Sequence, residues 1–213
     1  MLVGAGVVGA LALGGAWYVG VEPSQMTEHW RSLERWLMDH PGWLLLALVV
    51  LPGFPVPSSA LLVAAGVVWR ERPLLACLGC VLALLLNMSW TYWLAAGPVR
   101  RLMEKLLANS TRRLPDLPRS DHLRLILILR LTPGMPFFVQ NYALGMLRPP
   151  FLLYLSVSFL CNAPIVCGLV LSGAGLASGR VLPLLAGLAV IALAIVLTFS
   201  VRRWLARRRE PTG

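Results

Sequence analysis

Two copies of one short pattern interrupt long apolar stretches of this chain, Pro52-Gly-Phe-Pro55 and Pro133-Gly-Met-Pro136. Each proline removes a backbone hydrogen bond and clashes with the preceding turn, which costs about 3 kcal/mol in a helix interior. Neither stretch can therefore form one straight helix. Non-helical backbone at membrane depth persists only where protein or a water-filled cavity satisfies its polar groups. Two such breaks predict a paired, cavity-lining site of the kind found in carriers.

Composition indicates a membrane protein. Hydrophobic residues make up 58% and charged residues 13% of the 213 residues, whereas soluble domains carry about 25% charge. Apolar runs long enough for a span of about 20 residues cover residues 2–21, 74–97, 151–177 and 181–201. The proline-broken segments, 43–69 and 123–147, have halves of only about 8–12 residues, which are too short to cross a bilayer. We therefore predict an all-α polytopic membrane protein with about four transmembrane helices and two re-entrant hairpins.

The placement of positive charge predicts the orientation. If the first hairpin opens outside and the second inside, the outer connections carry 5 Lys/Arg and the inner connections and C-terminal tail carry 13. Cytoplasmic loops are enriched in these residues, so we expect both termini in the cytoplasm of a multi-pass protein of the plasma membrane, the bacterial inner membrane. The alternative is a run of ordinary helices with tolerated prolines.

The two hairpins also resemble an inverted repeat. Each break precedes an apolar half-helix that ends near Gly66 or Gly145, then a charged turn, and then a span that contains Asn87 or Asn162. The expected segments are an N-terminal transmembrane helix (1–21), an outer amphipathic linker (22–42), a core of two hairpin-plus-span repeats (43–177), a C-terminal transmembrane helix (178–201) and a basic cytoplasmic tail (202–213).

Residues Arg130–Phe138, followed by Asn141-Tyr-Ala-Leu-Gly145, closely resemble the signature of the DedA/VTT-domain superfamily, also called the SNARE-associated Golgi protein family. The resemblance runs from about Leu51 to Gly175, and Phe54-x-x-Pro57 followed by Gly66 matches the first family motif less specifically. It implies two opposed re-entrant hairpins. It also implies a scramblase or flippase that moves phospholipids or polyprenyl-phosphate lipids between leaflets.

The chain is similar to the family branch that lacks an acidic residue beside the first re-entrant prolines. Ser58-Ser59 stands in that place, and Pro136 stands where some members carry a second arginine. No Asp or Glu lies inside an apolar segment, although proton-coupled transport usually needs an intramembrane carboxylate or histidine relay. Passive scrambling is therefore favoured over proton coupling.

Arg130 is the strongest chemical feature of the apolar segments. Its planar guanidinium can bind two phosphate oxygens at once, and the half-helix that starts near Phe137 would direct free backbone N–H groups to the same space. An anionic lipid headgroup fits both. Alternatively, Arg130 binds the carbonyls freed by Pro133 and Pro136 and locks the hairpin.

Both breaks are expected to contribute to the substrate site. Asn and Tyr at membrane depth can instead bridge helices, and Ser58 and Ser59 stand where they would cap the second half-helix of the first hairpin. The predicted substrate-binding residues are Phe54, Pro55, Pro57, Ser58, Ser59, Arg130, Pro133, Pro136, Phe137, Asn141, Tyr142 and Gly145.

Other classes of function are less supported. The sequence contains no nucleophile–base pair or metal cluster at depth, so we expect no enzyme, no metal and no cofactor, and the four cysteines are interpreted as apolar packing. The basic tail indicates contact with anionic lipids and not with nucleic acid. The sequence leaves open whether the chain forms a homo-oligomer. A non-transporting scaffold for envelope assembly or membrane homeostasis is the second candidate.

Overall fold

The computed structural model describes residues 40–102, 121–132 and 134–207, which form helices joined by short turns, and no strand occurs in these ranges. The predicted all-α class is confirmed there. The expected span at 2–21, nearly all of the linker at 22–42 and the end of the basic tail lie outside the described residues. Apart from Pro41, the first residue of α3, all helices of the described ranges belong to one compact unit, Gly42–Gly213.

Three helices are long and apolar enough to cross a membrane. Helix α5 (Pro73–Leu94) continues through a π-helical turn, η2 (Ala95–Val99), to Leu102, and the others are α9 (Phe151–Ser178) and α10 (Val181–Arg207). Pro73 provides a favourable first residue for α5, and Gly179, with φ 65°, provides the left-handed residue that ends α9. These helices confirm the apolar runs predicted at 74–97, 151–177 and 181–201.

Both proline-rich patterns interrupt a helix. The first lies between α3 (Pro41–Val50), extended by the 3-10 turn η1 (Leu51–Gly53), and α4 (Ser58–Val68). The second lies between α7 (His122–Leu131) and α8 (Phe137–Leu147), where Gly134 has a φ of 81°. The alternative of continuous helices that tolerate these prolines is therefore wrong.

The first broken pair turns back on itself. A Cβ at Gly79 would lie 3.4 Å from Leu45 Cδ2 of α3, and Asn87 of α5 donates to the Val49 carbonyl. Helix α3 therefore runs in the direction of α5. Helix α4 must run back, because it ends at Val68, just before α5 begins.

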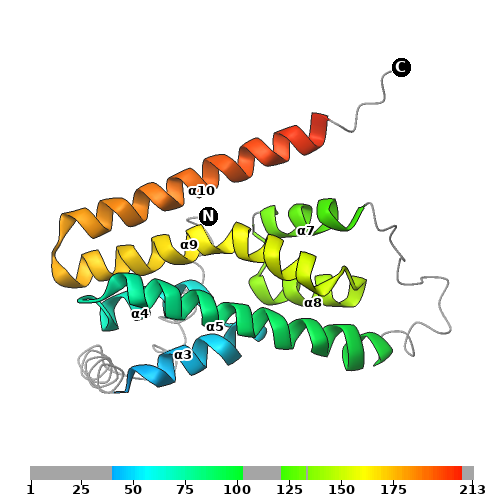
Figure 1. The fold of residues 1–213 in the computed structure, drawn as a ribbon, viewed down its shortest axis with the longest axis horizontal. Coiled ribbons are helices and arrows are strands. Elements are labelled where there is room, and N and C mark those ends of the chain that lie inside the picture. Colours follow the sequence, from blue (N-terminus) through cyan, green and yellow to red (C-terminus); the bar gives the residue numbers. More distant parts are fainter. Residues whose placement is uncertain (1–39, 103–120, 133, 208–213) are drawn as a thin grey trace, which may run out of the picture. The chain divides into compact units, whose positions relative to one another are not determined.

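The second broken pair also turns back. Tyr92 Oη donates to the Pro149 carbonyl at 2.6 Å, and Arg100 Nη1 donates to the Met146 carbonyl at 2.7 Å. The end of α8 and the start of α9 thus lie beside the end of α5 (Figure 1). The chain that contains α7 and α8 leaves and returns at the same end. Insertion of the two pairs from opposite membrane faces, and the inverted repeat, stay predictions.

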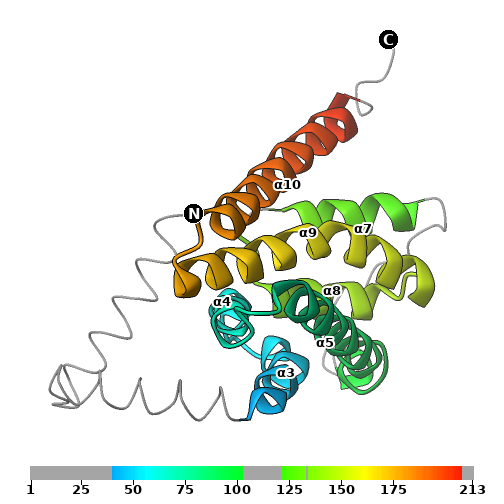
Figure 2. The same cartoon turned by 60° about the vertical axis from the view of Figure 1, so that its left-hand side comes forward.

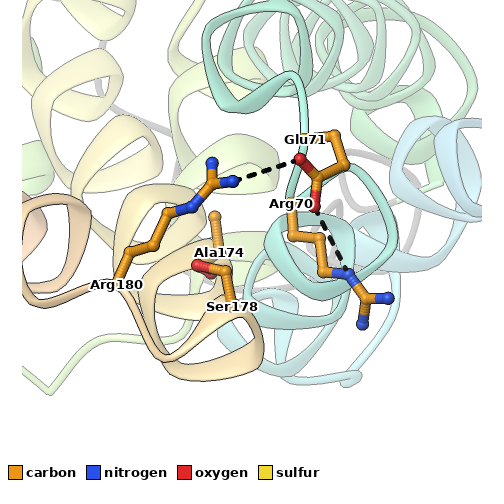
Figure 3. Close-up of polar contacts among 5 residues, drawn as sticks. All are labelled: Arg70, Glu71, Ala174, Ser178 and Arg180. Carbon is orange, nitrogen blue, oxygen red and sulfur yellow. Dashed lines mark hydrogen bonds and ion pairs between the residues drawn. The ribbon is translucent and has the colours of Figure 1, made fainter.

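An exposed ion-pair cluster joins two turns at the other end. Arg180 Nη2 lies 3.5 Å from Glu71 Oε2, and Arg70 Nε lies 3.9 Å from Glu71 Oε1 (Figure 3). The cluster connects the α4–α5 turn to the α9–α10 turn. Exposed pairs of this kind contribute about 1 kcal/mol or less, so the cluster marks the proximity of the turns more than it stabilises them.

Helix α9 packs against α10 on one side and against α4 and α5 on the other (Figures 1 and 2). Glycines allow this close approach. A Cβ at Gly66 of α4 would collide with the Val170 carbonyl, and one at Gly173 of α9 would collide with the Val63 carbonyl. On the other side, a Cβ at Gly168 would lie 2.9 Å from the Gly187 carbonyl of α10. Such close packing is a main source of helix association in a membrane, because burial of apolar side chains away from equally apolar lipid gives no hydrophobic gain.

We predict that Gly66→Ala lowers the thermal stability of the purified protein, with a loss of about 1–3 kcal/mol, because backbone must move to admit the methyl group. Gly97→Ala is the matched control, since nothing lies within 4 Å of its new Cβ. The measurement is thermal unfolding in detergent. Equal melting temperatures for the two variants would contradict the close packing of α4 against α9 at Gly66.

Candidate functional site

Arg130 lies in the last turn of α7 and is buried, with 8% of its surface exposed. Its Nε donates to Ser158 Oγ at 2.9 Å, Nη2 donates to Tyr154 Oη at 3.2 Å, and Nη1 donates to Gln140 Oε1 at 3.4 Å. The guanidinium carbon also lies 5.4 Å from the ring centres of Phe137 and Tyr154. Each nitrogen of the guanidinium therefore has a partner.

All three hydrogen-bond partners are neutral. Among the described residues, Arg130 forms no ion pair with a carboxylate. Insertion scales assign an arginine at mid-membrane a cost of about 2.5–3.5 kcal/mol, and hydroxyl and amide oxygens solvate the charge without cancelling it. The site is thus a buried, uncompensated positive charge held by polar side chains.

A chain of hydrogen bonds continues from this charge to the first broken pair. Tyr154 Oη lies 3.2 Å from the Met88 carbonyl and 3.5 Å from Asn141 Oδ1. Because the hydroxyl has one hydrogen, it donates to one of these two acceptors at a time. Asn141 Nδ2 donates to Asn87 Oδ1 at 3.3 Å. Asn87 Nδ2 donates to the Val49 carbonyl in the last turn of α3 at 2.7 Å. One polar network therefore joins both helix breaks through α5, α8 and α9.

The second break is held by a side-chain amide. Gln140 Nε2 donates to the Met135 carbonyl at 3.2 Å, while its Oε1 accepts from Arg130. The prediction that Arg130 itself binds the carbonyls freed by the prolines is therefore wrong, because its described acceptors are side-chain oxygens. The Gln140 side chain is long enough to donate to the Met135 carbonyl through Nε2 and to accept from the Arg130 guanidinium through Oε1.

The second motif is only partly gathered around Arg130. Phe137 and Asn141 belong to the network. Gly145 instead packs against the end of α5 and the start of η2, where a Cβ would lie 2.8 Å from the Tyr92 carbonyl and 2.5 Å from Ala95 Cβ. Tyr142 is half-buried and forms no hydrogen bond with the described residues. Pro136 is exposed and immediately precedes α8. Pro133 lies outside the described residues.

The first motif does not reach the network through its predicted side chains. Phe54 is 50% exposed, with its ring centre 6.4 Å from that of Trp90. The remaining predicted residues are exposed or half-buried: Pro55, Pro57, Ser58 and Ser59. The predicted capping by serine is wrong, because Pro57 occupies the N-cap position and places both serines inside the first turn of α4. The Val49 carbonyl connects this break to the network instead.

Three side chains of the network were not predicted from the sequence: Gln140, Tyr154 and Ser158. A signal for two of them exists on α9. Tyr154, Ser158 and Asn162 follow one another at intervals of four residues, which aligns them on one face of a helix, and Asn162 donates to the Ser158 carbonyl. A polar stripe on an apolar span indicates a polar neighbour.

The cysteines lie in two spans, Cys77 and Cys80 in α5 and Cys161 and Cys167 in α9, and all four are free thiols. Cys77 Sγ lies 3.9 Å from the Cys167 carbonyl. Within the described ranges, no group of three or more His, Cys, Asp or Glu residues could hold a metal ion.

Three long apolar helices around two broken pairs define a helical membrane protein with a buried polar centre. The family model of the VTT domain matches residues 56–175, which is more than half of the chain. The chain belongs to this family, as its resemblance to the DedA/SNARE-associated signature predicts. No curated protein and no solved structure matches the chain.

We predict that Tyr154→Phe lowers the unfolding free energy by about 1–3 kcal/mol, because Arg130 and the Met88 carbonyl lose a buried partner. Tyr142→Phe is the matched control, since its hydroxyl forms no hydrogen bond with the described residues. Thermal unfolding of the two variants in the same detergent measures the difference. A Tyr154→Phe protein as stable as the control would show that the network contributes nothing to the fold.

Proposed function

We propose that this protein moves phosphate-bearing lipids between the two leaflets of its membrane, and that the lipid headgroup crosses at the junction of the two broken helix pairs. The observation that carries the proposal is the buried charge of Arg130, which has only neutral partners among the described residues. Membership of the VTT-domain family, whose members are associated with lipid movement, supports the same conclusion.

A phosphate oxyanion satisfies Arg130 better than its present partners. Charge-assisted hydrogen bonds are roughly twice as strong as neutral ones, and the guanidinium fork matches two phosphate oxygens. Helix α8 begins at Phe137 without a side-chain cap, and its first backbone hydrogen bond runs from Gln140 N to the Pro136 carbonyl. The N–H groups of its first turn therefore remain available to an anion.

Access to Arg130 requires movement. The side chain is 8% exposed, so a headgroup reaches it only if the broken pairs separate. The backbone at the two breaks is not held by continuous helical hydrogen bonds, and η1 of the first pair contacts α8 of the second. In the proposed cycle, the polar side chains between the pairs solvate Arg130 when no lipid is present, and the lipid phosphate replaces some of them during passage.

The proposed transport is passive. Glu71 and Asp121 are the only acidic residues in the described ranges, and both are exposed at helix ends. Proton-coupled carriers usually hold a carboxylate or histidine at membrane depth, whereas the two histidines of the described ranges lie at helix starts, with His40 just before α3 and His122 as the first residue of α7. The proposed topology has two hairpins inserted from opposite faces of the bacterial inner membrane and both termini in the cytoplasm.

We expect Arg130→Lys to retain partial lipid exchange and Arg130→Ala to lose nearly all of it, because lysine keeps the charge but loses the two-pronged geometry. The measurement is leaflet exchange of labelled lipids in proteoliposomes, expressed per folded molecule. Arg101→Ala, which changes an exposed arginine outside the predicted site, serves as a control for reconstitution. An Arg130→Ala protein with normal stability and normal exchange would refute the binding role and favour the alternative of a non-transporting membrane scaffold.

We also predict the sidedness of three exposed positions in a protein without its native cysteines. Cysteine at Glu71 should react with an impermeant thiol reagent from outside the cell. Cysteines at Arg101 and Arg203 should react only after permeabilisation, because the pair α7–α8 returns to its starting side. If α7 and α8 together crossed the membrane, Arg203 would lie opposite Arg101. Labelling of these two positions from opposite sides would therefore exclude the second hairpin.

A further inference from the structure

The first turn of α7 contains three buried side-chain nitrogens without a hydrogen-bond partner, His122 Nδ1, Arg124 Nε and Arg124 Nη2. No other side-chain nitrogen or oxygen of the described residues is in this state. Buried polar atoms almost always have a partner, and an unpaired one commonly marks a missing water or ion. These atoms belong to neither the network around Arg130 nor its hydrogen-bond partners.

The two nitrogens of Arg124 lie on the same edge of its guanidinium. That edge presents two parallel N–H groups, which match two oxygens of a phosphate or carboxylate. Asp121 is the natural internal partner, because residues three apart are neighbours on a helix. Asp121 is exposed, however, and forms no ion pair with Arg124. The Nε and Nη2 edge of Arg124 is therefore shielded from solvent and has no hydrogen-bond partner.

The surroundings also favour an anion. Helix α7 begins at His122, and its N-cap residue, Asp121, makes no side-chain capping bond, so the positive end of the helix is not capped by that side chain. Side chains of a helix lean toward its N-terminus, which brings His122 and Arg124 toward these N–H groups.

We propose that the first turn of α7 is an oxyanion site that binds a phosphate group between Arg124 Nε and Nη2, with the α7 N-terminus and His122 as further contacts. The site is separate from Arg130, which lies six residues along the helix, about 9 Å at the usual rise. The same chemistry suits the phosphate of a lipid headgroup and a free phosphate ion. The inference goes beyond the proposed function, because binding at this site requires no transport.

The test measures binding to the purified full-length protein in detergent. Calorimetry follows inorganic phosphate, and native mass spectrometry follows phosphatidic acid, with diacylglycerol as the probe that lacks phosphate. Arg124→Ala should weaken phosphate binding by about tenfold or more, and Arg124→Lys should weaken it less, because it keeps the charge without the fork. Arg101→Ala, an exposed arginine, is the matched control and should change the affinity by less than about twofold.

The two sources of phosphate give different results. A lipid site retains phosphatidic acid but not diacylglycerol, and inorganic phosphate does not displace the lipid. A site for the free ion binds inorganic phosphate and releases the lipid when that ion is added. The proposal is overturned if the wild-type protein binds neither probe, or if Arg124→Ala or, where that variant does not fold, Arg124→Lys binds both with wild-type affinity.

The same variants separate this site from the proposed transport function. Arg124→Ala with lost phosphate binding and normal lipid exchange would support the site and leave the transport proposal intact. Arg130→Ala with lost exchange should still bind phosphate with wild-type affinity. If Arg130→Ala abolished phosphate binding while Arg124→Ala did not, the anion would be bound at Arg130 and the proposed site would be refuted.

Discussion

The buried charge of Arg130 is the constraint on which the centre of this protein depends. A guanidinium in a protein does not lose its proton, so the fold must solvate the charge wherever the chain places it. Here oxygens from α8 and α9 do so, namely those of Gln140, Tyr154 and Ser158. The requirement ties α7 to both helices at one point. Because α9 also contacts α4, α5 and α10, this point lies against the helix that organises the bundle.

The helix breaks depend on the same polar side chains. A broken helix leaves carbonyls without donors, which must be satisfied by protein in a membrane. Asn87 and Trp90 both donate to the Val49 carbonyl at the first break, and Gln140 donates to the Met135 carbonyl at the second. Asn141 joins the two sets through Asn87. The residues that stabilise the breaks are therefore continuous with those that solvate Arg130.

The sequence was sufficient for features that depend on local chemistry. Proline positions predicted both breaks, apolar length predicted the spans in the described part of the chain, and a lone charge on an apolar segment identified Arg130. The partners of Arg130 could not be read in the same way, because Tyr154 and Ser158 lie on a distant helix whose packing sets their direction. The first motif shows the converse. Its prolines separate α3 from α4, as predicted, but half of the Phe54 surface is exposed. A proline motif predicts where the helix is interrupted, and it does not predict which neighbouring side chains are buried.

The hydrogen bonds of the network around Arg130 differ in length. The bonds from α8 to its neighbours are the longest in the network, with Gln140 at 3.4 Å from Arg130 and Asn141 at 3.3 Å from Asn87 and 3.5 Å from Tyr154. The bond from Arg130 to Ser158 of α9 is 2.9 Å. Hydrogen bonds weaken as they lengthen beyond about 3.2 Å, so within this network a shift of the first turns of α8 breaks the weakest bonds and keeps Arg130 anchored to α9. Arg100 holds the other end of α8 at the Met146 carbonyl. Under the proposed function, a phosphate that enters beside α8 contacts both the guanidinium and the free N–H groups of the first turn of α8. Its oxygens then replace the acceptor that Gln140 provides to Arg130.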